Sequence, residues 1–346
     1  MKIGLVGYAG AGKSTAFQWL TGVAPDPAKV QAGQVGTAKV LDDRLTAIAA
    51  KYEPKKLTYA EVQFLDTPGL MRDERKDNNR RLGILRESNG LAVVLDGFTR
   101  TDFAAQLANF REELLFADLE ILSNRVPKLE AAMKKAKPQK EKDVDAAELA
   151  VVVRVIAGLE AGTPARAMHL SADDDKALRS FQLLTLKPEL VLVNRGDTGV
   201  NDPLPADLLA LSPAAVHAPV KLELELAALG DDDREAFMAD LGLTGLSRER
   251  VTRDLFYAMG RAVFFTVGAD ECRSWAMNRD SDAVTAAGCI HRDLSEKFVR
   301  ANVIGYADFL AHHYSERECK TKGLERTEGK GYVVKDADIL HILASS

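Results

Sequence analysis

A glycine-rich segment near the N-terminus carries the residue types that bind phosphate. It reads Gly7-x4-Gly12-Lys13-Ser14 and directly follows a short apolar stretch. Glycine permits positive φ angles, so such a loop can turn its N–H groups inward, and the helix that follows directs its positive end at the same point. A lysine here reaches the β and γ phosphates, and a serine hydroxyl suits Mg²⁺. The expected phosphate-binding residues are Gly7, Ala9, Gly10, Ala11, Gly12, Lys13, Ser14 and Thr15.

A carboxylate and a glycine follow a second apolar stretch. Residues 62–65 are expected to form a strand that ends at Asp66, with Gly69 three residues later. A carboxylate at a strand end can hold Mg²⁺ through water, and a glycine N–H beyond it can approach the γ phosphate without a Cβ in the way. This D-x-x-G pattern is weak alone, but behind a phosphate loop it indicates a nucleotide switch. The expected metal ligands are Ser14 and Asp66, and the expected catalytic groups are Lys13 and Gly69.

A third polar segment, Asn194-Arg195-Gly196-Asp197, also follows an apolar stretch. A carboxylate beside a base accepts hydrogen bonds from N1–H and the 2-amino group of guanine, whereas adenine offers neither donor there. The stem of Arg195 can lie along the purine face. We therefore expect Asn194, Arg195 and Asp197 to bind a purine base, with GTP favoured. An unrelated polar turn is the alternative for these four residues.

Length and composition indicate a globular protein of about two or three domains. The 346 residues are 46% apolar and 28% charged, and the net charge of −5 gives no general attraction to nucleic acid. Three cysteines without C-x2-C spacing argue against a disulfide framework or a zinc site. The apolar N-terminal run is short and enters the phosphate loop, so we expect a core strand, no membrane partner and a cytoplasmic location.

The chain between Gly69 and Asn194 is longer than two strand–helix units require. Apolar residues recur at helical spacing through residues 111–160, and Pro138 interrupts the pattern. We predict an inserted helical hairpin whose tip is the basic segment KKAKPQKEK at residues 134–142. This tip is either solvated surface or a partner contact.

Several stretches of the chain resemble the YchF branch of Obg-like P-loop GTPases and ATPases, and together they span nearly its whole length. They are VGTAKVLDDRL (35–45), FADLEIL (116–122), TPAR (163–166), FQLLTLKP (181–188), KLELELAAL (221–229), FFTVG (264–268), AAGCIHRDLSEKFVRANVIGY (286–306) and GKGYVVKDADILH (329–341).

The resemblance implies an α/β fold: a P-loop NTPase G domain with a mostly parallel sheet, an inserted α-helical hairpin and a C-terminal β-grasp domain of the TGS type. The expected bounds are 1–110 and 176–261 for the G domain, 111–175 for the hairpin and 262–346 for the TGS-like domain. It also implies Mg²⁺ as cofactor, GTP or ATP as substrate, and a ribosome or RNA as partner of an expected monomer. The alternative for the C-terminal domain is that it merely packs against the G domain.

The chain departs from the patterns of related proteins at the switches and the base. Leu70 stands where many GTPases have a water-orienting glutamine, as in the family, and because an apolar side chain cannot accept a hydrogen bond from water, we expect slow hydrolysis. Val30 aligns with the family's Mg²⁺-binding threonine. The family's N-x-x-E, associated with ATP preference, appears here as Asn194 to Asp197 with Arg195 inside, which is closer to the N-K-x-D of guanine-specific proteins and favours GTP. ATP remains an alternative, because the backbone near Val220 and Lys221 decides how the 6-substituent of the purine is met.

Three functions follow from these observations. The leading hypothesis is Mg²⁺-dependent hydrolysis of a purine nucleoside triphosphate by a ribosome- or RNA-associated switch. Val30 and Leu70 motivate the second, a nucleotide-binding scaffold that no longer hydrolyses. The third, a small-molecule kinase, would leave the base motif without a role. It would also need an arginine-rich lid, for which the candidates are Arg72, Arg75, Arg80, Arg81 and Arg86.

Overall fold

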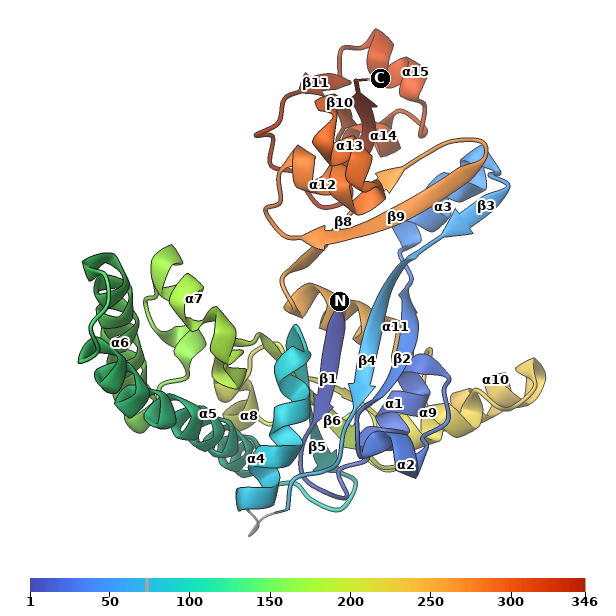
Figure 1. The fold of residues 1–346 in the computed structure, drawn as a ribbon. Helices are drawn as coiled ribbons and strands as arrows, with labels where there is room; N and C mark the ends of the chain where they lie inside the picture. The colour runs from blue at the N-terminus through green and yellow to red at the C-terminus, as the bar shows by residue number, and fades with distance from the viewer. Residues whose placement is uncertain (72–74, 346) are drawn as a thin grey trace. The chain divides into compact units, whose positions relative to one another are not determined.

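The computed structural model describes residues 1–71 and 75–345 and divides the chain into two compact units (Figure 1). The first unit contains residues 1–36 and 63–248, and the second contains residues 37–62 and 249–346. The helical insertion belongs to the first unit. Residues 37–62, which the sequence-based division placed in the G domain, group instead with the C-terminal segment.

A six-stranded sheet in the order β2-β4-β1-β5-β6-β7 forms the centre of the first unit. The pairs β1–β4, β1–β5, β5–β6 and β6–β7 are all parallel. Strands β1, β5 and β6 are almost continuously apolar and buried, as expected for parallel strands that are covered on both faces. The strands are β1 (Lys2–Val6), β2 (Gln34–Val40), β4 (Ala60–Asp66), β5 (Gly90–Gly97), β6 (Glu189–Arg195) and β7 (Val216–Ala218).

Helices of the first unit follow most of these strands along the chain. Strands β1, β4 and β6 run in the same direction in this sheet. Their carboxyl ends, and the polar residues that follow them, therefore lie at one edge. The helices are α1 (Lys13–Thr21), α2 (Pro27–Val30), α4 (Arg75–Gly83), α5 (Phe103–Met133), α6 (Gln139–Glu160), α7 (Ala172–Leu178), α8 (Ala206–Leu211), α9 (Val220–Leu226) and α10 (Asp231–Asp240).

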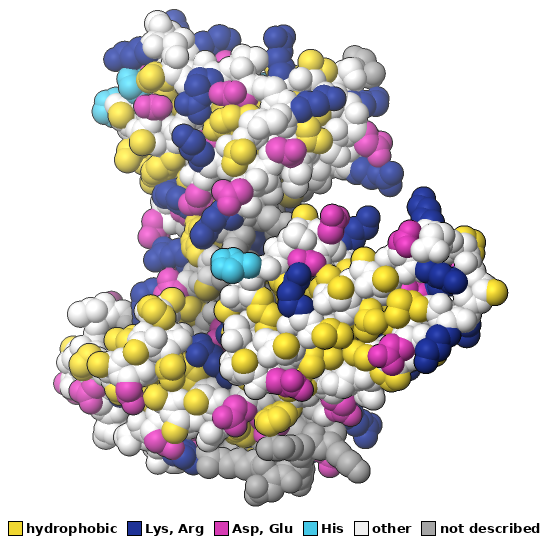
Figure 2. Space-filling model, turned by 90° about the vertical axis from the view of Figure 1, so that its left-hand side faces the viewer, with side chains coloured by type: hydrophobic (Ala, Val, Ile, Leu, Met, Phe, Trp, Pro, Cys, Tyr) yellow, Lys and Arg dark blue, Asp and Glu magenta, His cyan; other side chains and the backbone are white. Residues whose placement is uncertain are grey.

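The predicted helical hairpin is present as α5 and α6, which run side by side (Figure 1). Its interior is apolar, with Leu122, Leu129, Val152 and Val155 all buried. Helix α5 begins earlier than the apolar periodicity indicated, since it starts soon after β5 ends. Figure 2 views the molecule from the side on which α6 and α7 lie in Figure 1. Hydrophobic and charged side chains are mixed on this face, so it carries no single-sign field.

A second six-stranded sheet, in the order β11-β10-β12-β8-β9-β3, forms the second unit. The β8–β9, β10–β11 and β10–β12 pairs are antiparallel, and β12 and β3 pair in parallel with β8 and β9. The strands are β3 (Lys56–Thr58), β8 (Arg261–Thr266), β9 (Glu271–Asn278), β10 (Phe298–Ile304), β11 (Arg326–Glu328) and β12 (Ile339–Ala344). The helices are α3 (Asp43–Tyr52), α11 (Arg248–Ala258), α12 (Ala283–Ile290), α13 (Arg292–Glu296), α14 (Tyr306–Ala311) and α15 (Glu316–Thr321).

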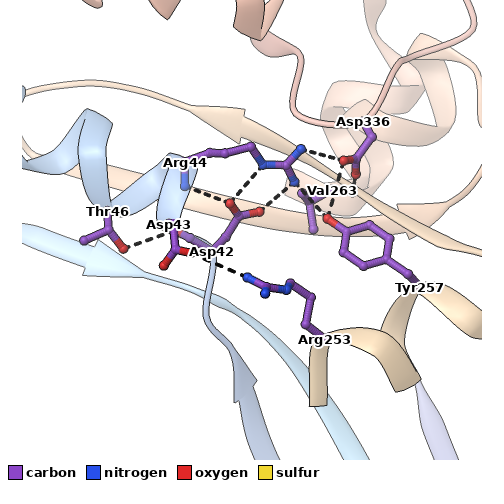
Figure 3. Close-up of polar contacts among 8 residues, drawn as sticks. All are labelled: Asp42, Asp43, Arg44, Thr46, Arg253, Tyr257, Val263 and Asp336. Atoms are coloured by element: carbon purple, nitrogen blue, oxygen red, sulfur yellow. Dashed lines mark hydrogen bonds and ion pairs between the residues drawn. The ribbon is translucent and has the colours of Figure 1, made fainter. Parts of the chain in front are cut away.

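Arg44 is one of the residues that join segment 37–62 to the rest of the second unit, in addition to the pairing of β3 with β9 (Figure 3). Its guanidinium contacts Asp42, which caps helix α3, at 2.7 Å. It also donates to Asp336 at 2.7 Å and to the Tyr257 hydroxyl at 2.8 Å. Asp336 in turn accepts from the Val263 N–H at 2.9 Å. One partly buried arginine thus joins α3, α11 and the C-terminal sheet, and this long-range network leaves no local signal in the sequence.

Within residues 1–71 and 75–345, none of the helices is both long enough and apolar enough to cross a bilayer. The expected α/β fold class, with a parallel-sheet G domain, a helical insertion and a mixed C-terminal domain, is confirmed.

Candidate nucleotide site

The glycine-rich loop lies between β1 and α1 and has the backbone that a phosphate cradle requires. The φ angles of Gly7, Gly10 and Gly12 are +145°, +85° and +83°. Gly12 is the N-cap of α1, and no side chain caps this helix end. The first N–H groups of α1 therefore have no partner from a capping side chain, and they stand at the positive end of the helix dipole.

Close packing is a second reason for glycine at two of these positions. A Cβ on Gly7 would collide with the Val94 carbonyl oxygen of β5, and a Cβ on Gly12 would collide with the Asn194 side chain of β6. The loop is thus held against β5 and β6 by close contacts that only glycine allows.

Lys13 begins α1 with its side chain almost fully buried, at 6% exposure. Its ammonium donates to the Tyr8 carbonyl at 2.9 Å, which folds the side chain back over the loop. Burial lowers the pKa of Lys13 to about 8, and the nearby Asp66 carboxylate partly opposes this shift. A lysine in this environment gains most from an added anionic partner.

Asp66 ends β4 and is completely buried. Burial raises its pKa, an effect that the Ser14 hydroxyl and the Lys13 ammonium partly oppose. Among the described residues, neither carboxylate oxygen has a hydrogen-bond partner of good geometry. A buried carboxylate without partners is costly, and a hard cation is the natural partner of such oxygens. Ser14 and Asp66 therefore fit a site for Mg²⁺.

Gly69 lies directly against the phosphate loop. A Cβ at this position would approach the Ala9 Cα to 2.5 Å and the Lys13 ammonium to 2.8 Å, so only glycine fits. The next residue fixes this contact, because the Ala9 N–H donates to the Leu70 carbonyl at 2.8 Å and the Leu70 N–H donates to the Gly7 carbonyl at 3.1 Å.

Leu70 and Val30 are the two residues at which the switch segments depart from related proteins. Leu70 is buried in the hydrophobic core of the first unit. Val30 ends α2, and its N–H donates to the Asp26 carbonyl at 2.9 Å. Neither side chain offers an oxygen to Mg²⁺ or to water.

Asn194 connects the base motif to the phosphate loop. Its amide donates to the Ala11 carbonyl at 3.0 Å, while its side-chain oxygen is buried without a partner among the described residues. Asp197 is exposed beyond the end of β6. The Arg195 guanidinium turns to the chain that follows, where it donates to the Asp202 carbonyl at 3.0 Å and lies 5.9 Å from the centre of the Phe103 ring. The guanidinium group of Arg195 thus stabilises the turn that follows β6.

Val220 and Lys221 begin α9, after the carboxyl end of β7. Val220 is fully buried, whereas Lys221 is exposed and pairs with Glu225 at 3.7 Å. The side chain of Val220 is therefore turned into the core, and whether the backbone of this segment meets the base stays a prediction.

Phe98 is a further candidate for the site, which the sequence reasoning did not name. It follows β5 and is 46% exposed, although it is a large aromatic side chain. Its ring lies 3.7 Å from the position of a Cβ built on Gly12, and its Cβ lies 3.3 Å from that of one built on Gly196. The signal available in the sequence was the position of this aromatic residue, directly after the apolar stretch that forms β5.

Two of the arginines of the kinase alternative have contacts within the first unit, and one of these is Arg81, which donates to the Asn78 side chain at 3.4 Å. Arg72 lies outside the described residues. Arg86 donates to the buried Asp118 of α5 at 2.8 Å and to the Ala117 carbonyl at 3.1 Å, so it has a structural role.

Comparisons with known proteins agree with this geometry. A family model described as "50S ribosome-binding GTPase" matches residues 2–125. The model for the C-terminal region of YchF GTPases, described as "Protein of unknown function (DUF933)", matches residues 262–345. The structure of the Schizosaccharomyces pombe YchF GTPase superposes with a TM-score of 0.82 at 23% identity, covering 99% of this chain and 97% of that one.

Two curated relatives are similar over nearly their full length. The "Ribosome-binding ATPase YchF" of Escherichia coli O157:H7 is 31% identical over 363 residues, which cover 99% of this chain and 98% of the relative. The protein of the same name from Bacillus subtilis is 28% identical, over 98% of this chain and 97% of the relative. With a glycine-rich phosphate loop, a D-x-x-G segment packed on it and these relatives, the chain belongs to the YchF family of P-loop NTPases.

Proposed function

We propose that this protein binds a purine nucleoside triphosphate with Mg²⁺ and hydrolyses it slowly as a ribosome-associated switch. The observation that carries the proposal is Asp66, a buried carboxylate that has no hydrogen bond of good geometry among the described residues and lies beside Lys13 and Ser14. A triphosphate and its metal would supply the charges that this cluster lacks.

Each group has a defined role in this proposal. N–H groups at the start of α1 hold the phosphate oxygens, and Lys13 neutralises charge on the β–γ bridge and the γ phosphate. Ser14 would hold Mg²⁺ directly and Asp66 would hold it through water. When bound, the metal would neutralise charge that develops on the phosphates. The Gly69 N–H senses the γ phosphate at the point where it packs on the loop.

GTP is the favoured nucleotide because Asp197 can accept from two donors of guanine that adenine lacks. The exposed Phe98 ring beside Gly12 and Gly196 offers a face on which the purine stacks. ATP is the alternative, in line with the names of the bacterial relatives.

Slow turnover follows from the buried Leu70, which cannot orient the attacking water. Purified protein should release phosphate more slowly than about 1 s⁻¹, the lower end of kinase rates. The second candidate function is a scaffold that binds nucleotide without hydrolysing it, which Val30 and Leu70 favour. Phosphate release measured with and without ribosomes separates them, since a rate of zero in both, with nucleotide bound, means a scaffold.

The partner that we propose for this chain rests on its similarity to the bacterial relatives. The bacterial relatives are named as ribosome-binding, and a ribosome or another RNA is the corresponding partner of this chain, which we propose acts as a cytoplasmic monomer. Cosedimentation with ribosomes in the presence of GTP, ATP or no nucleotide tests this directly. Pelleting that is the same under all three conditions would contradict a nucleotide-controlled switch.

The decisive experiment for the site is a titration of fluorescent GTP and ATP analogues in the presence of Mg²⁺. Lys13→Met should weaken binding about 100-fold, because a charge-assisted contact of up to about 3 kcal/mol is lost. Lys29→Met is the matched control, since Lys29 is exposed and lies outside the loop. Full affinity in Lys13→Met would contradict the proposal.

A further inference from the structure

A cavity in the first unit lies beside the phosphate loop and has a volume of about 510 Å³. The loop contributes Tyr8 and Ala9 to its wall, and Leu70 contributes from the segment that packs on the loop. Arg100, from the segment that follows β5, is also part of the wall. The proposed function places the γ phosphate at this loop and beside Gly69, so the cavity borders the position of the reacting group.

Arg100 is the only lysine or arginine among the described residues that line this cavity. Its Nε donates to Asp102 Oδ1 at 2.8 Å, and its Nη2 donates to the other oxygen of the same carboxylate. These contacts use two of the five N–H groups of the guanidinium, and the Arg100 side chain is 35% exposed. Asp102 thus holds Arg100 in place and leaves it donors for a further anion.

Other polar side chains of the cavity wall stabilise the turn after β5. Gln106 accepts from the Asp96 N–H at 3.1 Å and donates to the Asp96 carbonyl at 3.0 Å, so this glutamine is held by the backbone. The Asp96 carboxylate accepts from the N–H groups of Phe98 and Thr99, at 3.2 and 3.0 Å, and from the Thr99 hydroxyl. Arg100 is therefore the side chain of this wall that is best placed to act on a ligand.

The proposed reaction needs positive charge beside the γ phosphate. In phosphoryl transfer, cations stabilise the charge on the γ-phosphate oxygens, and in some P-loop enzymes an arginine of the same chain is one of them. Leu70 supplies neither a charge nor a hydrogen bond, and Lys13 is a single point charge. The planar guanidinium of Arg100 can donate parallel hydrogen bonds to two phosphate oxygens.

We propose that Arg100 is a catalytic residue that donates to the γ-phosphate oxygens in the transition state of hydrolysis, an inference that rests on the proposed function. Water forms the new bond to the γ phosphorus, and the bond from this phosphorus to the β–γ bridging oxygen breaks. The nucleoside diphosphate leaves with the electron pair of that bond, and both protons of the water remain on the released phosphate, H₂PO₄⁻. Arg100 exchanges no proton and stabilises only the charge.

Binding of a transition-state analogue tests this inference without turnover. Fluorescent GDP, and fluorescent ADP in parallel, is titrated into the full chain with Mg²⁺, with and without aluminium fluoride, which mimics the transferring phosphoryl group. Aluminium fluoride should tighten diphosphate binding by the wild type about 100-fold or more. Because Arg100 belongs to the same chain, this gain should need no ribosomes. Arg100→Ala should lose most of the gain but bind a non-hydrolysable GTP analogue with unchanged affinity, which also shows that its first unit is folded. The same gain in Arg100→Ala, or no gain in a wild type that binds the diphosphate, would overturn the inference.

Phosphate release is the second measurement. Arg100→Ala should lower kcat about 100-fold or more, since arginines in this role contribute about 10³-fold or more, and should leave KM unchanged. Arg154→Ala is the matched control, because Arg154 also pairs with one aspartate, Asp174, but does not line the cavity. An unchanged kcat in Arg100→Ala, or no phosphate release by a wild type that binds nucleotide, would overturn the inference. A wild type that binds no nucleotide would contradict the proposed function itself, so the two failures are distinguishable.

Discussion

Two buried aspartates in the first unit have opposite surroundings. Asp118 of α5 accepts from the N–H groups of Leu184 and Thr185, at 3.1 and 2.8 Å, and also from the Thr185 hydroxyl and Arg86. Asp66 at the phosphate loop is equally buried, yet no hydrogen bond of good geometry reaches its oxygens from the described residues. A carboxylate of the first kind stabilises the fold, whereas we propose that the second kind, Asp66, is held for a ligand.

The same contrast separates two glutamates. Glu223 of α9 accepts from Trp19 at 3.0 Å and from the N–H and hydroxyl of Ser247 at 2.7 and 2.6 Å, so its role is structural. Glu189 uses one oxygen for both Arg111 and Arg166 and leaves the other without a partner among the described residues. Burial alone therefore does not show how far the hydrogen bonds of a carboxylate are satisfied.

The largest expected effect comes from exchanging each aspartate for asparagine. Asp118→Asn should lower the free energy of unfolding by about 3 kcal/mol, because it leaves Arg86 and two backbone donors without their charged acceptor. Asp66→Asn should leave it unchanged or raise it by about 1 kcal/mol, since an unpaired buried charge is removed. Urea unfolding without nucleotide measures both. Equal destabilisation by the two changes would remove the distinction between these carboxylates.

The base motif should show a smaller effect. Asp197→Ala is expected to weaken GTP binding about tenfold, or about 1.4 kcal/mol, and to leave ATP binding unchanged, because only guanine offers donors to this carboxylate. Competition titrations with both nucleotides measure it. Asp202→Ala is the matched control, since Arg195 binds the Asp202 backbone carbonyl and not its side chain. Unchanged GTP affinity would show that Asp197 does not meet the base.

The smallest expected effect is a pH dependence from Lys13, whose pKa is lowered to about 8 by burial. Between pH 7 and 9 the free protein loses this positive charge, so nucleotide affinity should fall several-fold. The free energy of unfolding of the free protein should change in the opposite direction and rise with pH. The folded pKa is below the usual 10.5, so the penalty of the buried charge is present below pH 8 and is relieved as pH rises from 8 towards 10.5. In Lys13→Met both trends should disappear, and their persistence there would assign them to another group.

Sequence reasoning anticipated the parts of this protein that depend on neighbouring residues. The spacing of the residues from Gly7 to Ser14 predicts a phosphate loop, and the apolar periodicity of residues 111–160 predicts the hairpin. The place of α3 in the second unit involves contacts of Arg44 with Tyr257 and Asp336 and the pairing of β3 with β9, all between residues distant in the chain. The ion pairs of Glu189 with Arg111 and Arg166 likewise join three separate segments. Such arrangements become visible only when the chain is folded.

Diffraction from crystals grown with a non-hydrolysable GTP analogue and Mn²⁺ in place of Mg²⁺ tests the central claim most directly. We predict triphosphate density on the N–H groups of Gly10 to Thr15, and an anomalous peak beside Ser14 and Asp66. Density for the nucleotide elsewhere, with no metal peak near Asp66, would contradict the assignment of this buried carboxylate to ligand binding.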